Sequence, residues 1–378
     1  MTITIDLTTL IISGILLLLA ILTPLCSAFF RRIRSSETTT PRPTPVSIIM
    51  TVHDEADAVA RNLPLFLEQH SEAGFEIIVV DESSNSDTKD ALLLLQTEHP
   101  NLYTTFIPKS SHYLSRRKLA LTLGVKAAHN EWCILTDIRC RPADSHWLES
   151  MTSQMGDDTG LVLGLTGWES DAPAYWRFER LMNNCYQMRQ ADKHCAYRYD
   201  GRSLAFRRSV FMSNNGFLSN LKYQRGEYDF IANEHGGQQQ TAVSIVPSSQ
   251  LLQERVDGKT WKYAHLYYLE SRKHLNRSMS WRLLHNFDQA MLYLNYLADI
   301  AAFVYAVITA DWLLCGVSVL CLLLSMLLRI LIVKKAARSY GEQLPPLLIP
   351  LMELRTIWQY LYFMFSYRSA DKYDFIRR

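Results

Sequence analysis

Residues 76–88 read EIIVVDESSNSDT, a short apolar run that leads directly into a polar turn. The run is rich in β-branched residues, which favour a buried strand, and the Ser, Asn and Asp residues after it favour a turn. Residues 87–98 are then expected to form a helix. This strand–turn–helix unit indicates the fold class, because the segments on both sides of it repeat the pattern.

Strands and helices alternate throughout the segment around this unit. The expected strands are Val46–Val52, Glu76–Val80, Leu102–Ile107 and Glu131–Thr136, and the expected helices are 54–70, 87–98 and 116–128. Successive strands joined by helices pair in parallel through right-handed crossovers, and both faces of such a sheet are covered. We therefore predict an α/β fold with a mostly parallel sheet flanked by helices.

The composition excludes several classes of protein. The chain has 378 residues, of which 48% are hydrophobic and 20% are charged, so it is too apolar to be disordered. Its 39 Lys and Arg residues nearly balance its 37 Asp and Glu residues, which argues against a nucleic-acid partner. Its 7 cysteines form no CxxC pair and show no zinc-binding spacing, so we expect reduced thiols.

The apolar block at residues 10–30 predicts a transmembrane anchor. It carries no charge and is long enough to span the hydrocarbon core of a bilayer. Arg31, Arg32 and Arg34 follow at once, and the positive-inside rule then places the chain after them in the cytosol. The alternative, a cleaved signal peptide, requires its basic cluster before the apolar run rather than after it.

A second apolar block, 298–333, is interrupted at Asp311 and accommodates two helices, at about 295–310 and 313–333. Its alternative is a buried helical hairpin of a soluble protein. Cations follow this block too, at Lys334, Lys335 and Arg338. Both cation clusters predict the same topology, a multi-pass protein of the inner (cytoplasmic) membrane with a cytosolic catalytic domain and membrane lipids as partners.

The predicted organisation has five parts. They are an N-terminal anchor at 1–34, a Pro-rich linker at 35–45, a cytosolic domain at 46–290, a transmembrane hairpin at 294–333 and a cytosolic tail at 334–378. Residues 344–365 of the tail are apolar but include Glu353 and Arg355, which are costly inside a bilayer. An interfacial or re-entrant helix is expected there, with a fourth span as the alternative.

Polar side chains follow three of the expected strands, at His53, Asp54, Glu55, Asp81 and Asp137. The carboxyl ends of the strands form the ligand crevice of an open α/β sheet, so these groups are expected to face a ligand. Their alternative role is to cap the helices that follow. No GxGxxG follows the first strand and no GxxxxGK[ST] is present, so carboxylates and cations are expected to bind the ligand.

The order of these motifs resembles family 2 glycosyltransferases of the GT-A type, including their membrane-bound members. The matching stretches are SIIMTVHDEADAV (47–59), EIIVVDESSNSDT (76–88), RRKLALTLGVKAAHNEWCILTDIRCRP (116–142), GRSLAFRRSVF (201–211), RGEYDF (225–230) and ESRKH (270–274). The resemblance implies a GT-A-like fold and an inverting transferase. Such an enzyme moves a sugar from a nucleotide-sugar donor to a hydroxyl on a glycan or lipid-linked acceptor.

The resemblance also implies roles for individual residues. Asp81 would contact the nucleotide base, and Asp137, the first acid of the D-x-D motif, would bind the ribose and the Mg²⁺ or Mn²⁺ on the diphosphate. Other donor-side candidates are His53, Glu55 and Lys118, and the candidates for an acceptor site or diphosphate clamp are Arg202, Arg272, Lys273 and His274.

Three positions depart from the family pattern. The second acid of D-x-D is Arg139, which cannot bind a metal ion but can pair with phosphate. The usual catalytic base falls on Tyr228, whose ordinary pKa near 10 makes it a poor base, so Glu227 and Asp229 are the alternative bases. The clamp segment lacks the Gln and the Arg-Trp pair of processive synthases.

These departures leave two hypotheses of different classes. The first is an active glycosyltransferase, in which Arg139 neutralises the diphosphate. The second is a catalytically degenerate GT-A-like protein that acts as a nucleotide-binding or partner subunit. A small transporter is a third option, but the large soluble domain argues against it.

Overall fold

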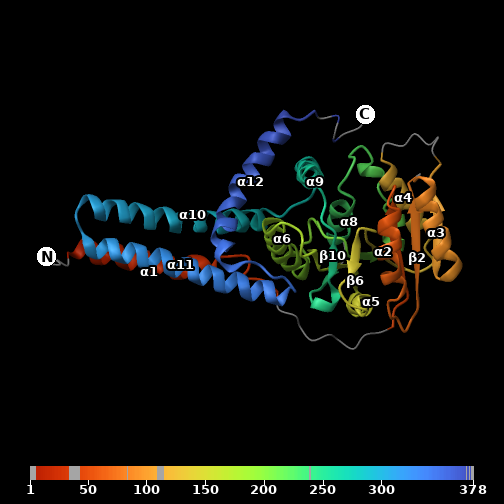
Figure 1. The fold of residues 1–378 in the computed structure, drawn as a ribbon, viewed down its shortest axis with the longest axis horizontal. Helices are drawn as coiled ribbons and strands as arrows, with labels where there is room; N and C mark the ends of the chain where they lie inside the picture. The colour runs from red at the N-terminus through yellow and green to blue at the C-terminus, as the bar shows by residue number, and fades with distance from the viewer. Residues whose placement is uncertain are drawn as a thin grey trace. The chain divides into compact units, whose positions relative to one another are not determined.

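The structure is a computed structural model (Figure 1). It describes residues 6–33, 43–82, 84–108, 115–237, 240–371, 373 and 375. Most of the linker expected at 35–45 lies outside these residues. The chain forms two compact units, a helical unit of Met1–Arg32 with Arg277–Leu361 and an α/β unit of Ile33–Asn276 with Tyr362–Arg378.

The α/β unit is built on a seven-stranded sheet (Figure 1). In spatial order its strands are β3 (Leu102–Phe106), β2 (Phe75–Asp81), β1 (Val46–Val52), β4 (Trp132–Leu135), β8 (Leu204–Arg207), β6 (Thr159–Gly164) and β9 (Gln240–Ser244). Neighbouring strands pair in parallel except at β8, which is antiparallel to β4 and β6. The predicted strands and the mostly parallel sheet are confirmed.

Helices connect and cover these strands. They are α2 (Ala56–Leu67), α3 (Ser86–Glu98), α4 (Arg116–Ala127), α5 (Trp147–Thr152), α6 (Ala174–Asp192), α7 (Arg208–Ser213), α8 (Glu227–Gly236) and α9 (Gly258–Ser271), with 3-10 turns at Leu218–Asn220, Pro247–Ser249 and Arg272–His274. A second sheet of three short strands has the order β5 (Cys140–Pro142), β10 (Leu251–Gln253), β7 (Thr166–Trp168). The sequence did not indicate this second sheet.

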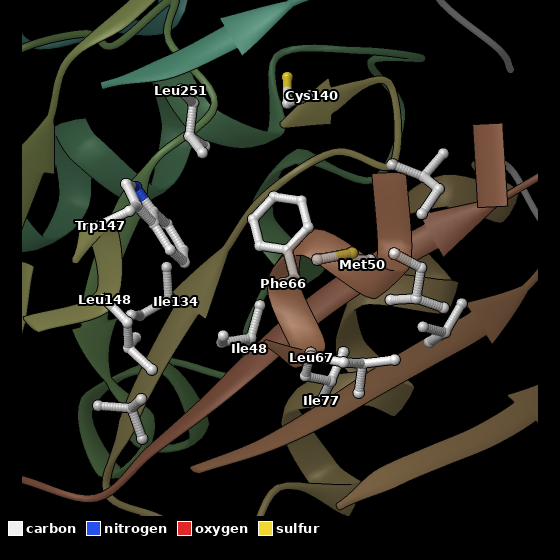
Figure 2. Packing of buried hydrophobic residues seen from close by; sticks show 14 of the residues in the cluster. Ile48, Met50, Phe66, Leu67, Ile77, Ile134, Cys140, Trp147, Leu148 and Leu251 are labelled. Carbon is white, nitrogen blue, oxygen red and sulfur yellow. The ribbon is translucent and has the colours of Figure 1, made fainter. Parts of the chain in front are cut away.

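Strand β1 is buried along its whole length because helices pack on both faces of it. Alternate residues of a strand point to opposite faces. Ile48 and Met50 pack with Phe66 of α2, whose ring meets that of Trp147 edge to face at a centroid distance of 5.3 Å (Figure 2). Burying each such side chain contributes about 1.5–3 kcal/mol.

The opposite face of β1 is covered by α4, and a glycine allows their close approach. A Cβ atom on Gly124 would lie 2.6 Å from the Cγ2 atom of Ile49 in β1, which is closer than a side chain tolerates. The approach of α4 to β1 and β2 places the first turn of the helix, with Arg117, at the carboxyl ends of the parallel strands.

Three helices of the helical unit are, among the described residues, long and apolar enough to cross a membrane. They are α1 (Leu7–Leu25), α10 (Met279–Ile308) and α11 (Trp312–Ser339). The span expected at 313–333 lies inside α11, and the span expected at 295–310 coincides with the second half of α10 and runs two residues past its end at Ile308. Asp311 lies in the turn between the two helices and caps the start of α11. The second segment of the helical unit begins at Arg277, whereas the predicted cytosolic domain extends to residue 290.

Residues 344–365 fold largely as α12 (Ile349–Ser369), preceded by a 3-10 turn at Pro346–Leu348. Among the described residues, α12 does not reach the apolarity of the three candidate spans. Its buried Glu353 forms an ion pair with Arg329 of α11 at 3.4 Å. The charge that made a span costly therefore has a partner within the helical unit.

Candidate functional site

The carboxyl ends of β2, β1 and β4 are adjacent, as the crossover rule requires. Asp81 ends β2 beside Val52 of β1, and its side chain is buried. Its Oδ1 atom accepts a hydrogen bond from the Ser84 N–H at 2.5 Å, while within the described residues its Oδ2 atom has no partner. The free oxygen is suited to accept from an N–H group of a ligand.

Asp137 follows β4 and lies between two arginines. Its Oδ2 atom is 2.7 Å from an Nη atom of Arg117, on α4, and 3.8 Å from Nε of Arg202, which precedes β8. Burial alone would raise the pKa of Asp137, but the two guanidinium groups outweigh it and lower the pKa to about 2. The carboxylate is therefore ionised at physiological pH and holds both cations in place.

Arg139 connects Asp137 to the segment after β1. Its backbone N–H donates to Oδ1 of Asp137 at 3.1 Å, and its Nε donates to Glu55 at 2.5 Å. Burial and the nearby Asp137 raise the pKa of Glu55, and Arg139 opposes this shift. The structure thus brings together Glu55, Asp137 and Arg139, three of the predicted donor-side residues, whereas His53 is an exposed neighbour that pairs with Asp54 at 3.7 Å.

Helix α8 supplies the acidic motif. Gly226 precedes it with φ of 98°, a left-handed conformation that favours glycine. Glu227 is buried, and neither of its carboxylate oxygens accepts a hydrogen bond within the described residues, although its charge helps to raise the pKa of Arg117. Burial raises the pKa of Tyr228 well above its ordinary value, so the phenol stays protonated and is not suited to act as a base.

Asp229 lies in an ionic cluster with Arg198 and Asp200. Its Oδ1 atom accepts from the backbone N–H of Tyr199 at 3.1 Å and is 3.5 Å from Nε of Arg198. Burial raises the pKa of Asp229 to about 6, against the opposing charge of Arg198. Arg198 also pairs with Asp200 at 3.5 Å. The Asp229 carboxylate thus has a hydrogen bond and an ion pair within the protein, whereas the Glu227 carboxylate has no hydrogen-bond partner among the described residues.

Lys118 and the predicted clamp occupy other surroundings. Lys118 is fully buried and donates to the carbonyl oxygens of Asn220 and Tyr223 at 2.7 and 2.8 Å, which indicates a structural role. The 3-10 turn Arg272–His274 carries the clamp. Lys273 pairs with the buried Glu270 at 3.1 Å. The ring of His274 lies 4.5 Å from that of Tyr223, so the clamp borders the loop that leads into α8.

Arg117 is the main site residue that the predicted donor set omitted. Helix α4 opens with Arg116, Arg117 and Lys118, and of these three cations only Lys118 is among the predicted donor-side residues. The residue that reaches Asp137 depends on the rotation of α4, which is set by the approach of Gly124 to β1. The run of three cations in the first turn was the sequence feature that pointed to Arg117. Cations at the start of a helix are unfavourable for its dipole, so their presence there indicates a role outside the helix.

The buried His235, at the end of α8, is expected to make the free energy of unfolding depend on pH. Burial lowers its pKa to about 4, and within the described residues neither ring nitrogen has a hydrogen-bond partner. The pKa of His235 is lower in the folded chain than in the unfolded chain, where it is about 6.5. This difference contributes stability that is fully present above about pH 6.5 and is lost as the pH falls toward 4. Between pH 7 and 5 the loss amounts to about 2 kcal/mol.

Asp229 acts in the opposite direction over the same range, because its pKa is raised to about 6. The wild-type chain alone therefore does not isolate the histidine. We expect His235→Leu to gain about 2 kcal/mol relative to wild type on going from pH 7 to pH 5. Denaturant unfolding of the full chain in detergent, followed by Trp fluorescence, measures this difference; parallel pH curves for both chains would contradict it.

Comparison with known proteins finds a family model that matches the segment around this site. Residues 47–213 match glycosyl transferase family 2. The match covers the segment from β1 to α7, with Asp81, Asp137 and Arg202, and confirms the resemblance predicted from the family 2 motifs. A comparison with curated proteins gave no match.

Solved structures with a similar fold include the mannosyltransferase PcManGT from Pyrobaculum calidifontis in complex with GDP-Man and Mn²⁺. The TM-score is 0.53 at 16% sequence identity, and the alignment covers 93% of this chain and 99% of that chain. S. aureus TarS 1–349 aligns with a TM-score of 0.42 at 10% identity over 68% of each chain. With the family 2 match, the first similarity supports the predicted GT-A-like fold.

The D-x-D position does not fit the divalent cation that the family pattern implies. Asp137 is already paired with Arg117 and Arg202, and the second acid is replaced by Arg139, whose guanidinium is not a ligand for Mg²⁺ or Mn²⁺. Among the described residues, no group of three or more His, Cys, Asp or Glu side chains is placed to hold a metal ion. The charged groups at this position are the guanidinium groups of Arg117 and Arg202 at Asp137 and that of Arg139 at Glu55.

Proposed function

We propose that the chain is a membrane-anchored glycosyltransferase that moves a sugar from a nucleotide-sugar donor to a hydroxyl acceptor with inversion. The observation that carries the proposal is the pairing of Asp137 with Arg117 and Arg202 at the carboxyl end of β4, inside the family 2 match. Guanidinium groups stabilise the negative charge that grows on a diphosphate leaving group.

The described residues support a division of roles. Asp81, with one free carboxylate oxygen, would bind the nucleotide base, and Asp137 would position the arginines and contact the ribose. Glu227 would accept the proton of the acceptor hydroxyl, because its carboxylate is not engaged by hydrogen bonds as that of Asp229 is.

The reaction balances in a single displacement. The acceptor oxygen gives its proton to the Glu227 carboxylate and forms a bond to the anomeric carbon. The bond between that carbon and the diphosphate oxygen breaks, and its electron pair leaves with the nucleoside diphosphate toward the arginines. Attack from the face opposite the leaving group inverts the anomeric centre.

Membrane anchoring is supported by α1, α10 and α11. The cations that follow the apolar segments, Arg31, Arg32 and Arg34 first and Lys334, Lys335 and Arg338 later, favour a multi-pass protein of the inner membrane. The α/β unit would then face the cytosol, where nucleotide sugars are made, and the acceptor would be a glycan or a lipid-linked hydroxyl.

The second candidate function is a nucleotide-binding or partner subunit without turnover. Arg139 at the D-x-D motif and the buried, protonated Tyr228 at the usual base position favour it. It predicts nucleotide binding without release of nucleoside diphosphate from any nucleotide sugar.

A panel of nucleotide sugars tests the proposal on the full chain in detergent. We expect one donor class to raise the melting temperature and to release its nucleoside diphosphate when an acceptor extract is added. Binding without release in the presence of a lipid or glycan acceptor would support the subunit. The absence of both binding and release for every donor would overturn the proposed transferase.

A further inference from the structure

We propose that Arg117, Arg139 and Arg202 bind the donor diphosphate directly, so that donor binding requires no divalent cation. The inference rests on the proposed function, since it concerns the same donor. It goes further because it assigns to three side chains the role that the family pattern gives to a metal ion on two carboxylates.

The first argument is that Asp137 is poorly available as a metal ligand. Its Oδ2 atom is bound by Arg117 at 2.7 Å and its Oδ1 atom by the backbone N–H of Arg139 at 3.1 Å. A metal ion would have to displace Arg117 from Oδ2 and would then lie beside the guanidinium groups of Arg117 and Arg202, which repel it. With Arg139 in place of the second acid, no carboxylate two residues away completes the coordination.

The second argument is that these arginines retain donors for a ligand. Within the described residues, the buried Nε atoms of Arg117 and Arg202 have no hydrogen-bond partner. A buried N–H without a partner is costly, and a diphosphate brings several acceptor oxygens. These unsatisfied donors belong to the two arginines that pair with Oδ2 of Asp137, and they are expected to find acceptors when the nucleotide sugar binds.

The third argument concerns Arg139. Its side chain is 47% exposed, and only its Nε is used, by Glu55 at 2.5 Å. Its terminal Nη groups make no hydrogen bond within the described chain and are available to an incoming phosphate. Glu55 thus fixes the direction of Arg139 and leaves the fork that binds phosphate oxygens free.

The charge balance agrees with this assignment. Replacing the second carboxylate of a D-x-D motif by a guanidinium changes the local charge by +2, which is the charge that one divalent cation brings. Asp137 remains ionised because Arg117 and Arg202 lower its pKa to about 2. The Asp137 carboxylate therefore holds Arg117 and Arg202 in position, and it needs no metal ion to stay ionised.

Calorimetric titration of the full chain in detergent with ADP, CDP, GDP, UDP and dTDP, in EDTA and in Mn²⁺, tests the inference. We expect at least one diphosphate to bind with the same Kd in both conditions. Arg139→Gln should weaken that binding about 10- to 100-fold in EDTA, as expected for the loss of a charge-assisted hydrogen bond. Arg139→Asp should bind only when Mn²⁺ is present.

Arg141→Gln is the matched control, because Arg141 lies two residues away and pairs with Glu169 at 2.7 Å. It should leave the diphosphate Kd unchanged, and melting temperatures verify that every variant is folded. Binding of a diphosphate to the wild-type chain in Mn²⁺ but not in EDTA would overturn the inference and leave the proposed function intact. Binding of no diphosphate in either condition would overturn both.

Discussion

Glu227→Gln is expected to lower the turnover number about 10²–10⁴-fold, the usual contribution of a general base. Glutamine keeps the size of the side chain but cannot accept the proton of the acceptor hydroxyl. The expectation rests on a buried carboxylate without a hydrogen-bond partner among the described residues, in the field of Arg117. Initial rates of nucleoside diphosphate release, measured with the donor found by the panel, provide the test.

Neighbouring positions on the same helix supply the controls. Asp229→Asn should lower turnover less, because Asp229 is engaged by Arg198 and the Tyr199 N–H, and Tyr228→Phe should retain turnover because the phenol stays protonated. Glu227→Gln should also leave nucleoside diphosphate affinity unchanged. A loss in Asp229→Asn that equals or exceeds the loss in Glu227→Gln would move the base to Asp229.

Local sequence patterns were enough to predict the first half of the sheet. Strands β1 to β4 are short β-branched runs separated by amphipathic segments, so each one could be recognised within its own window. The insertion of β8 between β4 and β6 could not be recognised in this way. Such pairings join residues far apart in the chain, and hydrophobic periodicity carries no information about the partner strand.

The candidate site was predictable to the same extent. Acids at strand ends could be located because the carboxyl edge of the sheet is defined by strand direction, and at that edge Asp81 is buried and Asp137 is partly buried. The choice between Arg117 and Lys118 could not be made, because it depends on how α4 rotates against β1. The division between Glu227 and Asp229 likewise depends on Arg198, which reaches the first turn of α8 from the segment between α6 and β8.

Composition did not indicate that α10 begins as early as Met279. Residues 277–294 contain several polar and charged side chains, so a hydropathy threshold assigns them to the soluble domain. In the structure residues 279–294 form the first half of α10, where the buried Asp288 pairs with Arg31, which follows α1. A hydropathy threshold scores each residue alone, so it cannot detect that a polar residue such as Asp288 has an ionic partner inside the unit.

The ion pair between Arg329 of α11 and Glu353 of α12 is expected to be the most sensitive contact of the helical unit. Both side chains are buried, at 3% and 6% exposure, and Arg329 also lies 3.4 Å from the Thr23 hydroxyl of α1. Removing one partner leaves the other charge buried and uncompensated, which costs about 3–5 kcal/mol. We therefore expect Arg329→Met and Glu353→Met each to lower the melting temperature of the full chain in detergent.

The double variant separates an ionic contribution from a simple loss of packing. When both charges are replaced by methionine, no uncompensated charge remains, and apolar side chains of similar length fill the space, so stability should recover to near that of wild type. If the two side chains act only through packing, the two single effects should add in the double variant. Additive losses would therefore contradict the ionic account, whereas recovery would show that the pair couples α11 to α12 and keeps a charged segment tolerable among apolar helices.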